Sequence, residues 1–349
     1  MKKIKVEGEK PYYVYIGENL LLNFGEFLKN NLKESCKIFV VTDNLVFSLY
    51  SDILKKSLEE AGFSVFFLVL ENKEQSKNFS NLLKIYEQLF KFNMSKEDII
   101  LSFGGGMISD ISGLCAATYK RGIRLINFPT TLLSQVDASI GGKNAINLEF
   151  GKNLVGTIYP PSMVFCDIAL LKTLSKREFY SGFAEVIKYA VGFSKELFNI
   201  LVKKDVETVL EEIIYRSIQI KKEIVEKDEF ENDVRIGLNF GHTVGHALEK
   251  YYNFKIKHGE ALALGMVYIT KSSYKAGITK FEDFLKLKFI LRKFNLKTVT
   301  NVDFEDIFKN VLADKKIVKD RINFSVIKNL GELKIMSLPI LQFKDFLRG

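Results

Sequence analysis

All three histidines of the chain lie in one short stretch, Arg235 to Glu260, whose residue types suit metal or acid–base chemistry. His242 and His246 are four residues apart, so on a helix they share one face. His258 follows a short aromatic and basic connection and opens the next helical pattern. Imidazole is a common zinc ligand, and a catalytic zinc usually takes three protein ligands and keeps one position open. The stretch therefore predicts a metal or acid–base site, and the spacing leaves open which histidines are ligands.

Composition and charge narrow the class of protein. The 349 residues are enough for two domains, and the hydrophobic content of 47% is that of an ordinary globular protein. No apolar run is long enough to cross a membrane, and the basic start of the chain lacks the apolar segment of a signal peptide. Three scattered cysteines favour a reduced, cytoplasmic setting. The net charge of +9 is spread along the chain, which disfavours nucleic acid as a partner and fits an anionic substrate or a lysine-rich surface.

The hydrophobic pattern predicts the domain organisation. In the first half, short β-branched runs such as Lys37–Thr42 alternate with stretches of helical spacing, which indicates βαβ units and a mostly parallel sheet. From about Leu170 the pattern is mainly helical, including one long helix over Lys195–Lys227, with an extended pair near the C-terminus. We therefore expect an α/β domain over residues 1–170 and an all-α domain over residues 171–349.

Two segments that follow predicted strands are candidates for binding an anion. Gly104–Gly106 joins a strand to a helix, where glycines let a ligand approach and the helix N-terminus offers N–H groups. A tight turn without a ligand would use the same glycines, and Asp110 could serve only to balance the helix charge. The polar run Pro129–Asn153 places Lys143 and Lys152 after glycines, where each could contact a phosphate or carboxylate. The alternative is an ordinary exposed loop, although so long a run is more often functional or folded on itself.

Six runs, in order along the chain, resemble 3-dehydroquinate synthase, an enzyme family of the shikimate pathway. They span most of the chain and are Gly104–Gly122, Pro129–Asn147, Gly151–Pro161, Leu171–Ala190, Leu238–Glu249 and His258–Met266. The resemblance implies a Rossmann-like NAD-binding domain, a helical domain for metal and substrate, and a homodimer. It implies NAD and a divalent metal, zinc or cobalt, as cofactors. The implied reaction converts 3-deoxy-D-arabino-heptulosonate 7-phosphate to 3-dehydroquinate and phosphate through transient oxidation, phosphate elimination, re-reduction and aldol closure.

The resemblance also assigns site residues. It gives the metal to Glu185, His242 and His258, and leaves His246 to proton transfer. From the residues alone, His246 could instead be the ligand and Glu185 a helix-surface partner of Lys188. The other catalytic positions are Lys143, Glu231 and Arg121. The NAD positions are Asp43, Glu74, Lys77, Gly105, Gly106, Asp110, Thr130, Thr131, Asp137, Lys152, Thr173, Leu174 and Glu178. The substrate positions are Lys143, Asn153, Lys188, Lys221, Arg235, Asn239, and Lys315 or Lys316.

Three other functions compete with this one. A relative of the same architecture could act on another sugar phosphate, as a sedoheptulose-phosphate cyclase or a deoxy-inosose synthase does. Arg235 with Asn239 favours the carboxylate-bearing substrate instead. A metal-dependent polyol dehydrogenase would accumulate NADH during turnover. A non-catalytic nucleotide or metal sensor would lack catalytic residues, which this sequence has.

Overall fold

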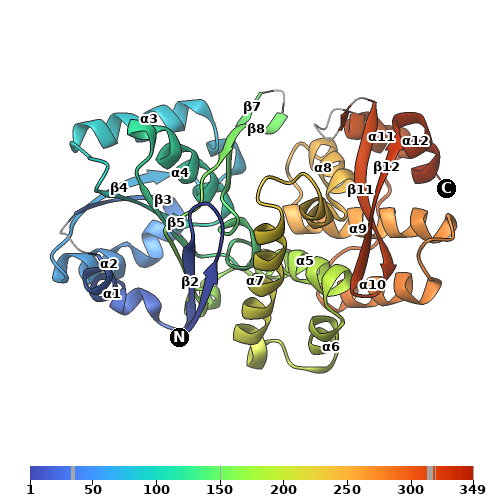
Figure 1. Ribbon diagram of the computed structural model, residues 1–349, viewed down its shortest axis with the longest axis horizontal. Helices are drawn as coiled ribbons and strands as arrows, with labels where there is room; N and C mark the ends of the chain where they lie inside the picture. The colour runs from blue at the N-terminus through green and yellow to red at the C-terminus, as the bar shows by residue number, and fades with distance from the viewer. Residues whose placement is uncertain (33–35, 150, 313–316, 319, 349) are drawn as a thin grey trace. The chain divides into compact units, whose positions relative to one another are not determined.

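A computed structural model describes residues 1–32, 36–149, 151–312, 317–318 and 320–348, which fold into two compact units. The first unit, Met1–Leu174, is an α/β unit, and the second, Ser175–Gly349, is mostly helical (Figure 1). The fold class expected from the sequence is thereby confirmed. Among the described residues, no helix combines the length and the apolar character that crossing a membrane requires.

The first unit is built on a seven-stranded sheet. Strand β1 pairs antiparallel with β2 at one edge, all further pairings are parallel, and β4 forms the other edge. Because the carboxyl ends of the parallel strands share one edge, that edge is where a ligand is expected in such a sheet. In spatial order the strands are β1 (Lys2–Val6), β2 (Tyr12–Gly17), β9 (Met163–Asp167), β6 (Arg124–Pro129), β5 (Ile99–Gly104), β3 (Lys37–Asp43) and β4 (Ser64–Leu70).

Helices cover both faces of this sheet because successive strand residues point to opposite sides. On β3, Ile38 and Val40 belong to the apolar cluster that includes α1 and α2, whereas Phe39 and Val41 belong to the cluster of α3 and α4. Figure 1 shows the two helix pairs on opposite sides of the strands. This double burial explains why the centre of β3, Ile38–Val41, is apolar at every position rather than alternating. The helices are α1 (Phe24–Asn31), α2 (Asn44–Glu60), α3 (Phe79–Lys91) and α4 (Gly106–Thr118).

The polar run Pro129–Asn153 is folded on itself rather than an open loop. After β6 it makes a π-helical turn, Ser134–Ala138, and then the antiparallel hairpin of β7 (Lys143–Leu148) and β8 (Gly151–Ile158). The ladder of this hairpin contains a register shift between Ile146 and Leu148, which marks a β-bulge.

The second unit is helical with a small sheet. The continuous helix expected over Lys195–Lys227 is wrong, because the structure has α6 and α7 separated by residues 204–209, which include the short 3₁₀ helix Glu207–Val209. There Asp205 accepts a hydrogen bond from the backbone N–H of Glu207 at 3.2 Å, a local contact that competes with helix formation. The helices are α5 (Lys176–Phe193), α6 (Lys195–Lys203), α7 (Leu210–Lys227), α8 (His242–Tyr251), α9 (His258–Lys275), α10 (Phe281–Lys293), α11 (Phe304–Leu312) and α12 (Ile340–Arg348).

The expected extended pair near the C-terminus forms an antiparallel hairpin in this second unit. Strand β11 (Arg321–Asn329) pairs with β12 (Glu332–Pro339) through a turn at Gly331, which has a left-handed φ of 82°. Strand β10 (Ile317–Val318) adds a third strand beside β11. The unit is therefore mainly, but not entirely, helical.

Candidate active site

Three helices of the second unit bring one carboxylate and two imidazoles together. Glu185 lies in the middle of α5, His242 opens α8, and His258 opens α9. Oε1 of Glu185 is 3.3 Å from Nε2 of His242 and 3.2 Å from Nε2 of His258. Ligand atoms of the three residues all lie within 4.8 Å of one another. Two imidazole nitrogens and a carboxylate oxygen form a donor set used by catalytic zinc, so these residues fit a divalent metal.

Glycines allow the three helices to approach this closely. A Cβ on Gly259 would lie 1.8 Å from the carbonyl oxygen of Ser181 on α5, and the N–H of Gly259 donates to Ser181 Oγ at 3.1 Å. A Cβ on Gly265 would lie 2.1 Å from the carbonyl oxygen of Gly241, which precedes α8 with a left-handed φ of 80°. These contacts set the distance of α9 from α5 and α8, and so place His258 beside the other two candidates.

The electrostatics give Glu185 and His242 the protonation states that a metal requires. Glu185 is 1% exposed, and its Oε2 lies 2.6 Å from Nζ of Lys188. Burial by itself would raise the pKa of Glu185, but the Lys188 ammonium and the neighbouring imidazoles outweigh it and hold that pKa well below its usual range. Burial lowers the pKa of His242 to about 4, against the attraction of Glu185. At neutral pH the carboxylate is therefore ionised and the His242 ring neutral, as metal binding demands.

His258 has a carboxylate on each side. Its Nδ1 lies 3.6 Å from Oε2 of Glu249, an ion-pair distance, and Glu249 is 3% exposed. Burial disfavours the charged ring, but the attraction of Glu249 and the contacts with both carboxylates raise the pKa of His258 to about 10. His242 similarly has its Nδ1 3.3 Å from the carbonyl oxygen of Phe240. Each ring thus directs Nε2 towards Glu185 and Nδ1 towards another oxygen.

His246 lies one helical turn after His242 on α8, as the spacing predicts. Its ring centroid is 5.4 Å from that of His242 and 6.1 Å from that of His258. With Glu249 and His258 it forms a second group whose ligand atoms lie within 4.8 Å of one another. Sequence reasoning missed Glu249, although its position three residues after His246 places it on the same face of α8. The group around Glu185 is distinguished by one oxygen that contacts two Nε2 atoms.

Cations predicted to bind substrate are buried in the same unit. Lys188 and Arg235 are each 1% exposed and Lys221 is 6% exposed. The backbone N–H of Arg235 donates to Asp228 Oδ2 at 3.0 Å, and its guanidinium donates to the carbonyl of Glu229. Buried cations are stable only near anions or acceptors, so this concentration of them suits an anionic ligand.

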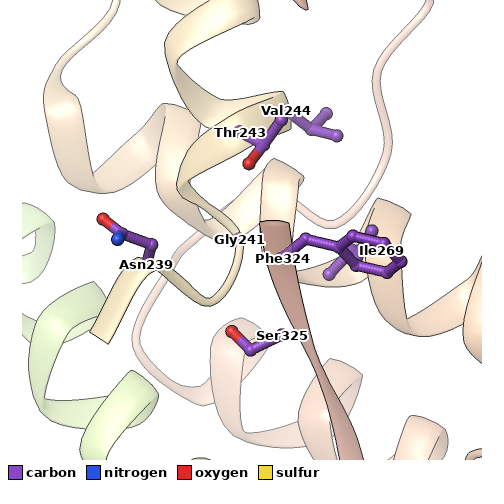
Figure 2. A pocket seen from close by; sticks show the side chains of 7 residues that line it. All are labelled: Asn239, Gly241, Thr243, Val244, Ile269, Phe324 and Ser325. Atoms are coloured by element: carbon purple, nitrogen blue, oxygen red, sulfur yellow. The ribbon is translucent and has the colours of Figure 1, made fainter. Parts of the chain in front are cut away.

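Asn239 lies at the end of the 3₁₀ helix Val234–Asn239, just before α8, and its Nδ2 donates to Glu231 Oε1 at 2.5 Å. In Figure 2 its side chain points away from Phe324 and Ile269. The cavity of about 10 Å³ beside it would hold at most one water, so it is not a substrate site. A larger hollow of about 330 Å³ contains no candidate residue; its lining is Phe198, Val202, Leu285, Lys286 and Phe289.

In the first unit, the start of α4 forms a cradle at the carboxyl edge of the sheet. Gly105 precedes α4 without a side-chain cap, and the first N–H groups of a helix have no acceptor within it. A Cβ on Gly105 would lie 3.2 Å from Cγ2 of Thr131, and one on Gly106 would lie 3.2 Å from Cβ of Ala138. The glycines thus let the segment after β6 lie against the helix start, an arrangement that fits the phosphates of a dinucleotide.

A network of charges joins the predicted cofactor positions to one predicted substrate position. The side chain of Lys77 is 4% exposed, and its Nζ is 2.7 Å from Asp110 Oδ2, 2.6 Å from Asn153 Oδ1 and 3.5 Å from Glu74 Oε1. Burial would lower the pKa of Lys77, but Asp110 and Glu74 outweigh it and raise that pKa. Nζ of Lys152 lies 3.8 Å from Glu74 Oε1. Lys77 is therefore charged, and it holds its neighbours together.

Asp43, at the end of β3, has a structural role in addition to its predicted one. Its Oδ1 accepts hydrogen bonds from the backbone N–H groups of Leu45 and Val46, both at 3.0 Å, and so caps α2. Asn72 donates to the same oxygen at 3.2 Å. Residue type and position fit a helix cap and a cofactor contact equally well, so the sequence did not separate the two.

The remaining predicted positions lie at several places. Arg121 is exposed on the turn after α4, which returns the chain to the amino end of the sheet, so the structure does not bring it to the other candidates of its unit. Lys315 and Lys316 lie outside the described residues. Glu178, in the first turn of α5, forms an ion pair with Lys257. Thr130 is buried directly after β6, and Asp137 lies in the π-helical turn. Lys143 is exposed at the start of β7. Oγ1 of Thr173 is 2.5 Å from Oη of Tyr50, and Leu174 is the next residue in the chain.

Comparison with known proteins gives full-length matches. Residues 67–181 match the sequence model described as 3-dehydroquinate synthase N-terminal, and residues 182–317 match the one described as 3-dehydroquinate synthase C-terminal. The 3-dehydroquinate synthase of Clostridium kluyveri is 43% identical over 99% of this chain and 98% of that protein. That of Clostridium acetobutylicum is 40% identical over 100% of this chain and 99% of that protein.

Solved structures share the fold. A 2-deoxy-scyllo-inosose synthase complexed with carbaglucose-6-phosphate, NAD⁺ and Co²⁺ has a TM-score of 0.89 at 23% identity, covering 99% of each chain. The 2-epi-5-epi-valiolone synthase of Streptomyces hygroscopicus, with NAD⁺ and Zn²⁺ bound, has a TM-score of 0.88 at 23% identity, covering 99% of this chain and 98% of that chain. A glycerol dehydrogenase of Schizosaccharomyces pombe is more distant, with a TM-score of 0.64 at 18% identity over 96% of this chain and 87% of that one.

Proposed function

Because the chain belongs to the 3-dehydroquinate synthase family, we propose that it converts 3-deoxy-D-arabino-heptulosonate 7-phosphate to 3-dehydroquinate and phosphate. The observation that carries the proposal is the convergence of Glu185, His242 and His258 in a unit that also buries Lys188 and Arg235. A metal centre with buried cations suits a substrate that carries both a carboxylate and a phosphate. Identity of about 40% to named synthases over nearly the whole chain supports the same reaction.

We assign the divalent metal, zinc or cobalt, to Glu185, His242 and His258, and NAD to the cradle before α4 and the network around Lys77. When bound, NAD supplies a transient oxidation and re-reduction at a substrate carbon, and the metal supplies polarisation of the oxygen on that carbon. Two synthases of the same fold, solved with NAD⁺ and Co²⁺ or Zn²⁺, support this pair of cofactors. The charge of Lys188, 2.6 Å from Glu185, keeps that carboxylate ionised for its ligand role.

The chain's other groups would bind and orient the substrate. Arg235 has a planar guanidinium that suits the substrate carboxylate, and Asn239 follows it four residues later in the chain. His246, one turn after the metal ligand His242 on α8, would move the proton when phosphate leaves. Glu231, which accepts a hydrogen bond from Asn239, would assist this proton transfer. The lysines would neutralise the phosphate and Asn153 would donate a hydrogen bond to it. These positions are Lys143, Asn153, Lys188, Lys221 and the Lys315–Lys316 pair, with Arg121 as a further catalytic position.

We further propose that the enzyme is a homodimer, as the family resemblance implies, and that it works in the cytoplasm, which the three scattered cysteines favour. Size-exclusion chromatography with light scattering tests the assembly. A particle of about twice the 40.0 kDa chain mass supports the dimer, and a monomer at micromolar concentration contradicts it.

The reaction itself is tested by identifying the product. Purified protein is incubated with 3-deoxy-D-arabino-heptulosonate 7-phosphate, NAD and zinc or cobalt, and the product is characterised by NMR. We expect 3-dehydroquinate, and its loss after exhaustive chelation. Glucose 6-phosphate, which lacks the carboxylate, is the control substrate. Turnover of glucose 6-phosphate without turnover of the seven-carbon acid would reject the proposal in favour of another sugar-phosphate cyclase.

A further inference from the structure

Asn147 occupies the β-bulge of the β7–β8 hairpin. The ladder pairs Ile146 with Val155 and Leu148 with Gly151, so one residue of β7, Asn147, faces three residues of β8, 152–154. Bulges of this kind re-aim side chains and are common beside active sites. Here the bulged segment of β8 contains Lys152 and Asn153, a predicted NAD position and a predicted substrate position.

Asn147 uses its backbone and both ends of its amide. Its backbone N–H donates to the carbonyl of Lys77 at 2.8 Å. Its Nδ2 donates to Glu74 Oε1 at 2.8 Å, and its Oδ1 accepts from the backbone N–H of Asn153 at 3.0 Å. All three distances are those of normal hydrogen bonds. One side chain therefore connects the segment of Glu74 and Lys77 to the bulged strand.

The connection determines where Asn153 points. Asn153 has a left-handed φ of 53°, a conformation that needs support from its surroundings. Asn147 Oδ1 supplies part of that support from the N–H side, and Asn153 Oδ1 lies 2.6 Å from Nζ of Lys77. Lys77 in turn contacts Asp110, in the first turns of α4, at 2.7 Å. A shift at Asn147 would therefore reach both the cofactor cradle and Asn153.

We propose that Asn147 is a positioning residue that sets the hairpin against the Glu74–Lys77 segment and so couples the NAD side of the site to the substrate side. This inference rests on the proposed function for the identity of the two ligands. Asn147 acts through Glu74, Lys77 and Asn153, which would touch the ligands, and it need not touch them itself.

Asn144 offers a matched control for a merely structural role. It lies on the same strand, is 6% exposed, and donates through Nδ2 to the carbonyls of Gly142 at 2.7 Å and Tyr159 at 3.0 Å. Both acceptors belong to the hairpin region and not to the Glu74–Lys77 segment. Asn144→Ala therefore weakens the hairpin without cutting the link that the proposal requires.

The test measures NAD binding apart from turnover. The dissociation constant of NAD is determined by calorimetry, and the melting temperature by circular dichroism, for the wild type, Asn147→Ala and Asn144→Ala. We expect Asn147→Ala to weaken NAD binding and to raise the substrate KM, each on the order of tenfold, as the loss of one or two hydrogen bonds implies. Asn144→Ala should lower the melting temperature at least as much while its NAD dissociation constant stays within about twofold of the wild type, since both of its hydrogen bonds go to carbonyls of the hairpin region, those of Gly142 and Tyr159.

Asn147→Asp separates the contact with Glu74 from the contact with Asn153, and it replaces the alanine variant in the test if that variant does not fold. The aspartate can still accept from the N–H of Asn153, but it loses the donor to Glu74 and sets a second carboxylate against it. We expect NAD binding to weaken as in Asn147→Ala, with a smaller rise in substrate KM.

Two outcomes would overturn the proposal. One is an NAD dissociation constant unchanged in both Asn147 variants. The other is an equal loss of NAD affinity in Asn144→Ala. Failure of the proposed function is a separate result: a wild type that binds NAD but does not release phosphate. In that case NAD affinity in the Asn147 variants still decides whether this residue positions the cofactor side.

Discussion

Replacing Glu185 by glutamine removes one charge from the centre of the second unit with almost no change in shape. The carboxylate contacts two imidazoles through Oε1 and lies 2.6 Å from the Lys188 ammonium through Oε2. The side chain of Lys188 is only 2% exposed, so the variant removes a carboxylate that forms a buried ion pair with its ammonium. Removing one partner of a buried ion pair costs about 3–5 kcal/mol. We expect that loss in the metal-free protein, together with loss of stoichiometric zinc.

The assay separates these two effects. Urea unfolding of the metal-free wild type and Glu185→Gln, followed by circular dichroism, gives the change in stability. Equilibrium dialysis against zinc, followed by elemental analysis, gives the metal content. In the double variant Glu185→Gln/Lys188→Met the buried ammonium of Lys188 is gone as well, so we expect most of the stability to return and the metal to remain absent. A single variant that keeps one zinc per chain and loses less than about 1 kcal/mol would refute the reasoning.

Three further predictions follow from the same unit and from the thiols. Gly259→Ala should push α9 away from α5, since its Cβ would lie 1.8 Å from the carbonyl oxygen of Ser181. The variant should therefore have a lower melting temperature and a lower zinc affinity. Unchanged zinc affinity would contradict the account of how His258 is placed. Because the pKa of His258 is raised to about 10 in the metal-free protein, its ring carries a proton between pH 7 and 10 that zinc must displace, so apparent affinity should rise with pH there. Calorimetry at pH 8 in buffers of different ionisation enthalpy should show roughly one proton released for each zinc bound. Glu249→Gln should release fewer protons, because Glu249 is the main group that raises the pKa of His258. A binding enthalpy that does not depend on the buffer would contradict the assignment. The three buried thiols, those of Cys36, Cys115 and Cys166, should react with a disulfide reagent only after unfolding, because burial raises the pKa of each. Rapid reaction of the native protein would show that the thiols are not buried.

The parts of the fold that have a simple period were predictable. The centre of β3, Ile38–Val41, is a continuous apolar run because helices cover both faces of the strand, and the spacing of His242 and His246 correctly places them one turn apart on α8. The break after α6 was not predictable from period alone, since the predicted helical spacing runs through Lys204, whereas beyond the helix end Asp205 accepts from the N–H of Glu207, a local contact that competes with helix formation.

The site could be predicted only in part, because its contacts join distant segments. No spacing rule connects Glu185 with His242, and only the family resemblance proposed Glu185 as a ligand before the structure placed the two within 3.3 Å. Asn147 was missed for a similar reason. Its role depends on a bulge in a segment whose strands the pattern did not reveal, and on hydrogen bonds to Glu74 and Lys77 from another part of the chain.

The most direct test of the central claim follows phosphate and NADH in the same reaction. The enzyme is mixed with 3-deoxy-D-arabino-heptulosonate 7-phosphate, zinc and NAD, while phosphate release and absorbance at 340 nm are recorded together. The account predicts many phosphates released per enzyme with no net NADH, because NAD is reduced and reoxidised within each turnover. NADH that accumulates in step with substrate loss, without phosphate release, would instead identify a dehydrogenase of the same fold and contradict the account.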